Sequence, residues 1–165
     1  MSSSKPDNES RRVLALARRY LRFGTRSAAE LRAYLAKRGA SPKDIEPAVS
    51  VCSRAGLLDD AVCAKLWATT LADRGYAWEA IRGQLLSKGL EPPLIDRTLH
   101  PLQARADDAS RIRDLVDARL RDRARTDPHL RTRLARLLAR RGFDADLIER
   151  VLVESFGPAS SHAES

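Results

Sequence analysis

The residue types in this chain that could carry out chemistry are two cysteines, three histidines and two pairs of adjacent acids. Cys52 and Cys63 lack CxxC spacing, and neither has a histidine nearby in the sequence to act as its base. The histidines lie in unrelated settings, at His100, His129 and His162. We therefore expect the cysteines to be small buried hydrophobic residues of a reducing compartment rather than nucleophiles.

The acid pairs, Asp59-Asp60 and Asp107-Asp108, could indicate a metal site. Carboxylates at the start of a helix also accept hydrogen bonds from its free backbone N–H groups, and we favour this capping role for both pairs. The sequence contains no HExxH, GxSxG, GxGxxG or GxxxxGK[ST] motif. We expect no catalytic residues, no metal site, no cofactor and no enzymatic activity.

Basic residues are the remaining functional candidates. The segment from Pro128 to Phe143 contains five arginines and no acid, whereas the segment from Arg111 to Arg125 mixes arginines with aspartates. A helix of the first kind carries charge of one sign, which suits either a binding patch or an ordinary solvated surface; we leave both open. The candidate patch for a protein or DNA partner is Arg131, Arg133, Arg136, Arg140, Arg141, Arg82, Lys88, Arg32 and Arg38.

Composition limits the class of protein. The net charge of +8 and the pI near 10.2 favour a polyanionic partner, either nucleic acid or an acidic protein surface. Aromatic residues make up 5% of the chain and charged residues 32%, so each core must be small. No apolar run reaches the length of a membrane span, and the polar first ten residues are not a signal peptide. We expect a cytoplasmic protein that does not bind membranes.

A pattern of five positions occurs three times along the chain, which indicates an internal repeat. Each copy has two apolar residues four apart, a glycine preceded by a cation, and two further apolar residues. The copies are Leu31, Leu35, Gly39, Ile45 and Val49; Ile81, Leu85, Gly89, Ile95 and Leu99; and Leu134, Leu138, Gly142, Ile148 and Leu152. The cations are Arg38, Lys88 and Arg141, which also complement the carbonyl end of a helix dipole.

The repeated pattern predicts a helix, a glycine in the left-handed conformation, a short turn and a second helix. Start signals support this prediction: a capping box at Ser27–Glu30, prolines after Ser41 and Glu91, and a capping Asp144. A further helix precedes each pattern, from about Arg11 to Phe23 in the first copy and from Ala104 to Arg125 in the third, and Pro101 ends the helix before that one. In the second copy we expect Val62 and Leu66 to face the core.

The sequence thus predicts an all-α protein of three tandem three-helix repeats, stacked into an elongated, curved array. The repeats are expected at residues 11–55, 56–102 and 103–156, between disordered tails at residues 1–10 and 157–165. Trp67, Tyr76 and Trp78 are stacking platforms for bases or, more in line with their irregular spacing, packing groups.

The pattern resembles the RecX family of bacterial recombination regulators over about residues 11–156. The resemblance is most specific at two central motifs and extends to glycine motifs in all three copies: Gly56-Leu57-Leu58-Asp59-Asp60, Asp73-Arg74-Gly75-Tyr76, Arg38-Gly39, Lys88-Gly89 and Arg141-Gly142-Phe143. Two positions depart from the family pattern: Cys63 replaces an aromatic residue, and Ala77-Trp78 replaces a small residue followed by proline. Ala77 is a poor helix cap, so the helix after it has a weak start signal.

The resemblance implies a regulator that binds RecA filaments on single-stranded DNA and inhibits their extension, ATPase and strand exchange, which restrains recombination and the SOS response. It implies no enzymatic activity and supplies no short motif for RecA contact. The partners are then a RecA filament and, as an open question, single-stranded DNA, with the protein acting as a monomer. The alternative from charge alone is a helical protein that binds nucleic acid directly, without RecA; an inert scaffold is a third class.

Overall fold

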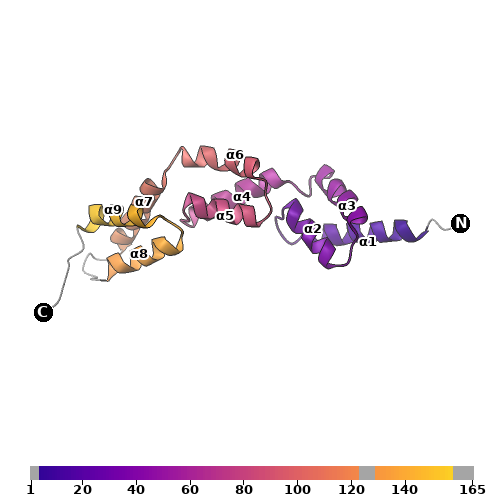
Figure 1. The fold of residues 1–165 in the computed structure, drawn as a ribbon, viewed down its shortest axis with the longest axis horizontal. Helices are drawn as coiled ribbons and strands as arrows, with labels where there is room; N and C mark the ends of the chain where they lie inside the picture. Colours follow the sequence, from indigo (N-terminus) through magenta and orange to yellow (C-terminus); the bar gives the residue numbers. More distant parts are fainter. Residues whose placement is uncertain (1–3, 123–128, 158–165) are drawn as a thin grey trace. The chain divides into compact units, whose positions relative to one another are not determined.

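The computed structural model describes residues 4–122 and 129–157, and these residues form nine helices (Figure 1). The helices are α1 (Ser4–Leu21), α2 (Ala28–Lys37), α3 (Pro42–Arg54), α4 (Asp60–Asp73), α5 (Trp78–Ser87), α6 (Pro92–Gln103), α7 (Asp108–Asp122), α8 (Leu130–Arg140) and α9 (Ala145–Phe156). No strand occurs in the described residues, and none of their helices is long and apolar enough to cross a membrane. The predicted all-α class is confirmed.

The chain divides into two compact units. Unit 1 comprises Met1–Trp67 and Gln84–Thr98, and unit 2 comprises Ala68–Gly83 and Leu99–Ser165. The division passes through α4, α5 and α6, which are the helices of the second predicted repeat. Helices α1 to α3 belong to unit 1, whereas α7 to α9 belong to unit 2.

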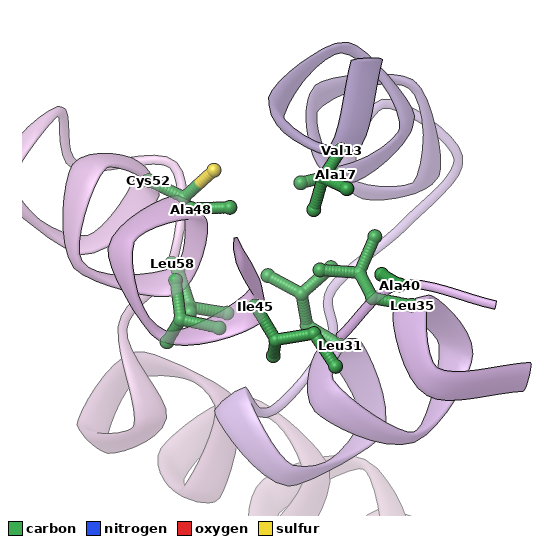
Figure 2. Packing of buried hydrophobic residues seen from close by; sticks show 10 residues of the cluster. Val13, Ala17, Leu31, Leu35, Ala40, Ile45, Ala48, Cys52 and Leu58 are labelled. Atoms are coloured by element: carbon green, nitrogen blue, oxygen red, sulfur yellow. The ribbon is translucent and has the colours of Figure 1, made fainter. Parts of the chain in front are cut away.

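The core of unit 1 forms where three helices each turn one apolar stripe inward. Leu31 and Leu35, one helical turn apart on α2, are fully buried, and burial of a leucine side chain contributes about 1.5–3 kcal/mol. Figure 2 shows them between Val13 and Ala17 of α1 and Ile45 of α3. The residues predicted to repeat are therefore the core residues of a three-helix repeat.

The start of α1 differs from the prediction. Residues 1–10 were expected to be disordered, but α1 begins at Ser4 and ends at Leu21, before the expected Phe23. Two interactions hold the early turns: Ser10 Oγ donates to Asp44 Oδ1 at 2.9 Å, and Glu9 pairs with Arg12 at 2.7 Å. The prediction of disorder is wrong for residues 4–10. A tertiary contact and an i,i+3 ion pair stabilise the helix in a segment whose polar composition favours disorder.

Most helix starts agree with the sequence. The capping box is present, since Glu30 N donates to Ser27 Oγ at 3.1 Å and Ser27 N donates to Glu30 Oε2 at 3.0 Å. Asp144 accepts from Leu147 N at 3.0 Å. Helices α3 and α6 begin at the predicted prolines. Each of these signals is local, so the sequence alone reveals it.

Two other helix bounds need correction. Pro101 lies inside α6, which continues to Gln103, because one missing N–H near the end of a helix removes a single hydrogen bond. Helix α7 begins at Asp108 rather than Ala104, since Asp107 accepts from Ser110 N at 2.7 Å and caps the helix there. Residues 123–125 and the expected tail at residues 158–165 lie outside the described residues.

The inward face of α4 also differs from the prediction. Val62 and Leu66 were expected in the core, but both are exposed, whereas Cys63, Ala64 and Ala68 are buried. Residues four apart lie on the same face of a helix. The pair Ala64 and Ala68 therefore marks the buried face of α4, and the pair Val62 and Leu66 marks its exposed face. The two large aliphatic residues therefore do not pack in the hydrophobic core of the protein.

The core of unit 2 joins α7, α8 and α9. Ile112 and Val116 of α7 are fully buried, as predicted, and Leu134 and Leu138 of α8 pack in the same cluster. Leu152 of α9 completes it from the third helix. The third predicted repeat therefore has the same three-helix core as the first.

Both cysteines are free and buried, as predicted. Burial raises the pKa of Cys52, and it raises the pKa of Cys63 to about 11, where Asp60 adds a further upward effect. Cys63 Sγ also donates to the carbonyl oxygen of Arg26 at 3.0 Å. Both thiols are therefore expected to be unreactive, because few of them are present as thiolate.

At about pH 8, only about one molecule in a thousand would carry a Cys63 thiolate, because its pKa is about 11. We expect the native protein to react with Ellman's reagent at least tenfold more slowly per thiol than the protein in urea, where both thiols regain an ordinary pKa. Absorbance of the released chromophore measures both rates. Equal rates would show that the thiols are not protected by the fold.

Candidate interaction surfaces

Helix α8 is amphipathic, with leucines on one face and arginines on the other. Its buried residues include Leu134 and Leu138, four apart, and they attach the helix to the unit 2 core. Arg133, Arg136 and Arg140 are exposed. The buried face therefore fixes the direction in which three of the predicted arginines point.

A groove of about 360 Å³ lies in unit 2, where α7 meets α8. We call it the α7–α8 groove, and its lining residues are Arg119, Leu130, Arg133, Leu134, Leu137 and Arg140. Three guanidinium groups thus stand around an aliphatic floor, and no acid is among the described residues that line it. Such a groove suits a ligand that presents negative charge beside apolar surface.

The sequence pattern did not indicate Arg119, because its helix mixes basic and acidic residues. The useful signal is its position rather than local composition: it lies on α7 at the side that faces α8. Helical spacing along α7 from buried Ile112 and Val116 could have indicated this side. The prediction from charge runs alone selected one wall of the groove and not the other.

Arg131 and Arg141 of the predicted α8 segment contact residues outside α8. Arg131 pairs with Glu149 of α9 at 2.5 Å. The guanidinium of Arg141 lies 4.8 Å from the ring centre of Tyr76. These two arginines therefore contribute to contacts within unit 2.

Lys88 lies at a junction in unit 1 between the start of α2 and the end of α5. Its carbonyl oxygen accepts from Ser27 Oγ at 2.6 Å, and its Nζ pairs with Glu30 at 3.2 Å. Its ammonium group also lies 4.3 Å from the ring centre of Trp67. We call this arrangement the unit 1 junction; it explains why a cation and an aromatic residue occupy these positions.

The same junction includes a carboxylate supplied by another helix. Asp60, the first residue of α4, accepts from the backbone N–H of Ala28 in α2 at 2.8 Å. Asp59 instead caps its own helix, accepting from Ala61 N at 2.8 Å. The predicted capping role of the pair is confirmed, with the difference that Asp60 caps a helix of the preceding repeat.

Unit 2 contains a junction of matching design, at the start of α5. Ala77 N donates to the carbonyl oxygen of Arg141 at 2.9 Å, and Trp78 N donates to Asp108 at 3.3 Å. Asp108 is the first residue of α7, as Asp60 is of α4. We call this the unit 2 junction, and it explains how α5 begins after Ala77, which has no capping side chain.

Arg111 lies buried at the unit 2 junction. Its guanidinium donates to Asp108 at 3.1 Å and to the carbonyl oxygen of Ala72 at 3.1 Å, and it lies 4.1 Å from the ring centre of Trp78. Burial lowers the pKa of Arg111 and raises the pKa of Asp108, although their pairing opposes both shifts. Sequence reasoning did not single out this arginine, because its partners are distant in the chain.

The remaining candidates do not join the α7–α8 groove lining. Arg32 makes two hydrogen bonds to Glu46, the shorter at 2.8 Å, and Arg38 lies 5.0 Å from the ring centre of Tyr34. Arg82 is half-buried. The described residues contain no group of three histidine, cysteine or acidic side chains that could hold a metal ion.

Comparison with known proteins agrees with this architecture. Residues 106–152 match a family model described as RecX, third three-helix domain. The regulatory protein RecX of Mycobacterium avium (strain 104) is 36% identical over 158 residues, covering 93% of this chain and 90% of that protein. The regulatory protein RecX of Thermobifida fusca (strain YX) is 30% identical over 154 residues, covering 92% and 83%.

Solved structures support the fold. The crystal structure of RecX from Lactobacillus salivarius superposes with a TM-score of 0.69 at 16% identity, covering 90% of this chain and 97% of that chain. The protein is thus an all-α protein of the three-helix-repeat class. At the level of sequence it belongs to the RecX family, and it is a regulatory protein rather than an enzyme.

Proposed function

We propose that this protein binds RecA filaments on single-stranded DNA and inhibits their extension, ATPase and strand exchange. Membership of the RecX family, at 36% identity to a curated regulator, is the observation that carries the proposal. The net charge of +8 supports a polyanionic partner such as a filament with bound DNA. The protein would restrain recombination and the SOS response in the cytoplasm, acting as a monomer.

The α7–α8 groove is the proposed contact site. Arg119, Arg133 and Arg140 line it around an aliphatic floor, so it offers both charge and apolar contact to the filament. A filament repeats its surface, and three repeats on one chain can make several weak contacts with it. Such contacts reinforce one another through effective concentration, so a small amount of protein can act on a long filament.

The direct test measures ATP hydrolysis by RecA on single-stranded DNA, with this protein present in substoichiometric amounts. We expect the rate to fall over time, because filaments that lose subunits cannot extend again. Electron microscopy should then show shorter filaments. An unchanged ATPase at equimolar protein would contradict the proposal.

Charge reversal tests the groove. The double variant Arg133→Glu and Arg140→Glu should weaken ATPase inhibition at least about tenfold, because it replaces two attractive charges by two repulsive ones. The matched control is Arg105→Glu and Arg150→Glu, which changes the same net charge at two exposed positions of unit 2 outside the groove. If both double variants inhibit equally, net charge rather than the groove governs binding.

An alternative function is direct binding of nucleic acid without RecA, which the acid-free lining of the α7–α8 groove also suits. Salt titration of binding to single-stranded DNA alone separates the two functions. Three phosphate contacts would give a slope of about −2 in a plot of log affinity against log salt. Tight binding with such a slope, and no effect on RecA, would favour the alternative.

A further inference from the structure

Unit 1 exposes a cluster of large apolar side chains. Phe23 is 75% exposed, Val62 60%, Leu57 50% and Leu66 49%, and we call these four residues the apolar patch. Val62 and Leu66 lie one turn apart on α4, and Leu57 lies in the turn before that helix. Large exposed hydrophobic residues that occur together often mark an interaction site.

The patch borders a groove of about 380 Å³ within unit 1. Leu57 and Val62 line this groove, and Phe23 stands between Arg22 and Gly24, which also line it. Two of the four patch residues are therefore part of the groove lining, which gives the groove an apolar part.

Repeat symmetry shows that the fold does not need this exposed apolar surface. The first helix of each repeat has a fully buried pair four residues apart: Val13 and Ala17, Ala64 and Ala68, and Ile112 and Val116. When these pairs are aligned, the positions of Val62 and Leu66 are taken by Ser110 and Asp114 in the third repeat, and by Arg11 and Ala15 in the first. Only the middle repeat places two large aliphatic residues there.

The groove also contains positive charge without matching acceptors. Arg22 has no ion-pair partner among the described residues. Arg26 lies 5.0 Å from the ring centre of Tyr20, and its Nε is buried with no hydrogen-bond acceptor in the described part of the chain. The acid in the groove lining, Asp59, already accepts from Ala61 N and Val62 N. An incoming carboxylate would pair with the exposed guanidinium of Arg22.

We infer that the apolar patch and its groove are a second docking surface, which binds a protein segment carrying a carboxylate next to large apolar side chains. This inference rests on the proposed function, and it assigns the patch to the protein of the filament rather than to its DNA. Aliphatic side chains offer no partner to phosphates, whereas they bury well against protein. A second copy of this chain is a poor occupant, since both copies carry a net charge of +8.

The test replaces Leu57 and Val62 by serine. The matched control replaces Leu86 and Val153 by serine as well; these residues are 42% and 36% exposed and lie outside the patch. We expect the patch variant to bind RecA filaments on single-stranded DNA at least about tenfold more weakly than the wild type, at both low and high salt. The control should bind within about twofold of the wild type, and both variants should bind single-stranded DNA alone as the wild type does.

Arg22→Glu tests the carboxylate. The loss of filament affinity in this variant should be larger at low salt than at high salt, because the substitution affects only a charged contact and salt screens such contacts. Equal binding by the patch variant and the wild type would overturn the inference while leaving the proposed function intact. Absence of any filament binding by the wild type would overturn both. Sedimentation that shows a wild-type dimer and a monomeric patch variant would instead identify a second copy as the occupant.

Discussion

Replacement of Gly89 by alanine is expected to lower the free energy of unfolding by about 3 kcal/mol. Gly89 has φ of +74°, which costs other residues about 1–2 kcal/mol, and an added Cβ would lie 2.3 Å from the Cβ of Ala29. Relief of this overlap requires movement at the unit 1 junction, at a typical cost of 1–3 kcal/mol. Urea unfolding followed by circular dichroism measures the loss.

Gly39→Ala is the matched control. Gly39 has φ of +83° at the corresponding position of the first repeat, but nothing lies within 4 Å of its added Cβ. This variant should lose only the conformational part, about 1–2 kcal/mol. Gly142→Ala should behave like Gly89→Ala, because its Cβ would lie 2.7 Å from the Cβ of Ala80. Equal losses at Gly39 and Gly89 would show that close approach at the junction contributes nothing.

Replacement of Arg111 by alanine should destabilise the protein by about 2–3 kcal/mol. The side chain is 10% exposed, donates to Asp108 and to the Ala72 carbonyl, and stacks on Trp78. Its removal leaves a partly buried carboxylate without its cation, which costs less than a fully buried one because Asp108 still contacts solvent. Thermal and urea unfolding should both report the loss.

Arg113→Ala provides the comparison on the same helix. Arg113 also forms an ion pair, with Glu154 at 3.2 Å, but both side chains are well exposed. Exposed pairs contribute about 0–1 kcal/mol, so we expect a change of about 0.5 kcal/mol or less. Similar losses at Arg111 and Arg113 would mean that burial and stacking at the unit 2 junction do not stabilise the fold.

Local signals explain what the sequence predicts well. The capping box at Ser27, the cap at Asp144 and the prolines at Pro42 and Pro92 act within one turn of the chain, so they can be read without knowing the fold. The buried leucines of α2 and α8 follow from helical spacing for the same reason. These features were predicted, and the structure confirms them.

Features that depend on distant segments were not predicted. Asp60 and Asp108 each cap a helix of the preceding repeat, and nothing near them in the sequence indicates this. Val62 and Leu66 fit a core-facing stripe as well as Ala64 and Ala68 do, so hydrophobicity alone chose the wrong face of α4. Arg119 was missed because its role depends on the neighbouring α8.

The two junctions have a consequence for synthesis on the ribosome. Helix α2 obtains the carboxylate for its Ala28 amide from Asp60, and its Ser27 hydroxyl reaches the Lys88 carbonyl. A nascent chain that has released only the first repeat therefore exposes a helix start whose acceptors have not yet emerged from the ribosome. Each of the first two repeats reaches its final hydrogen bonding only when the next one has emerged, so completion of the fold follows the order of translation.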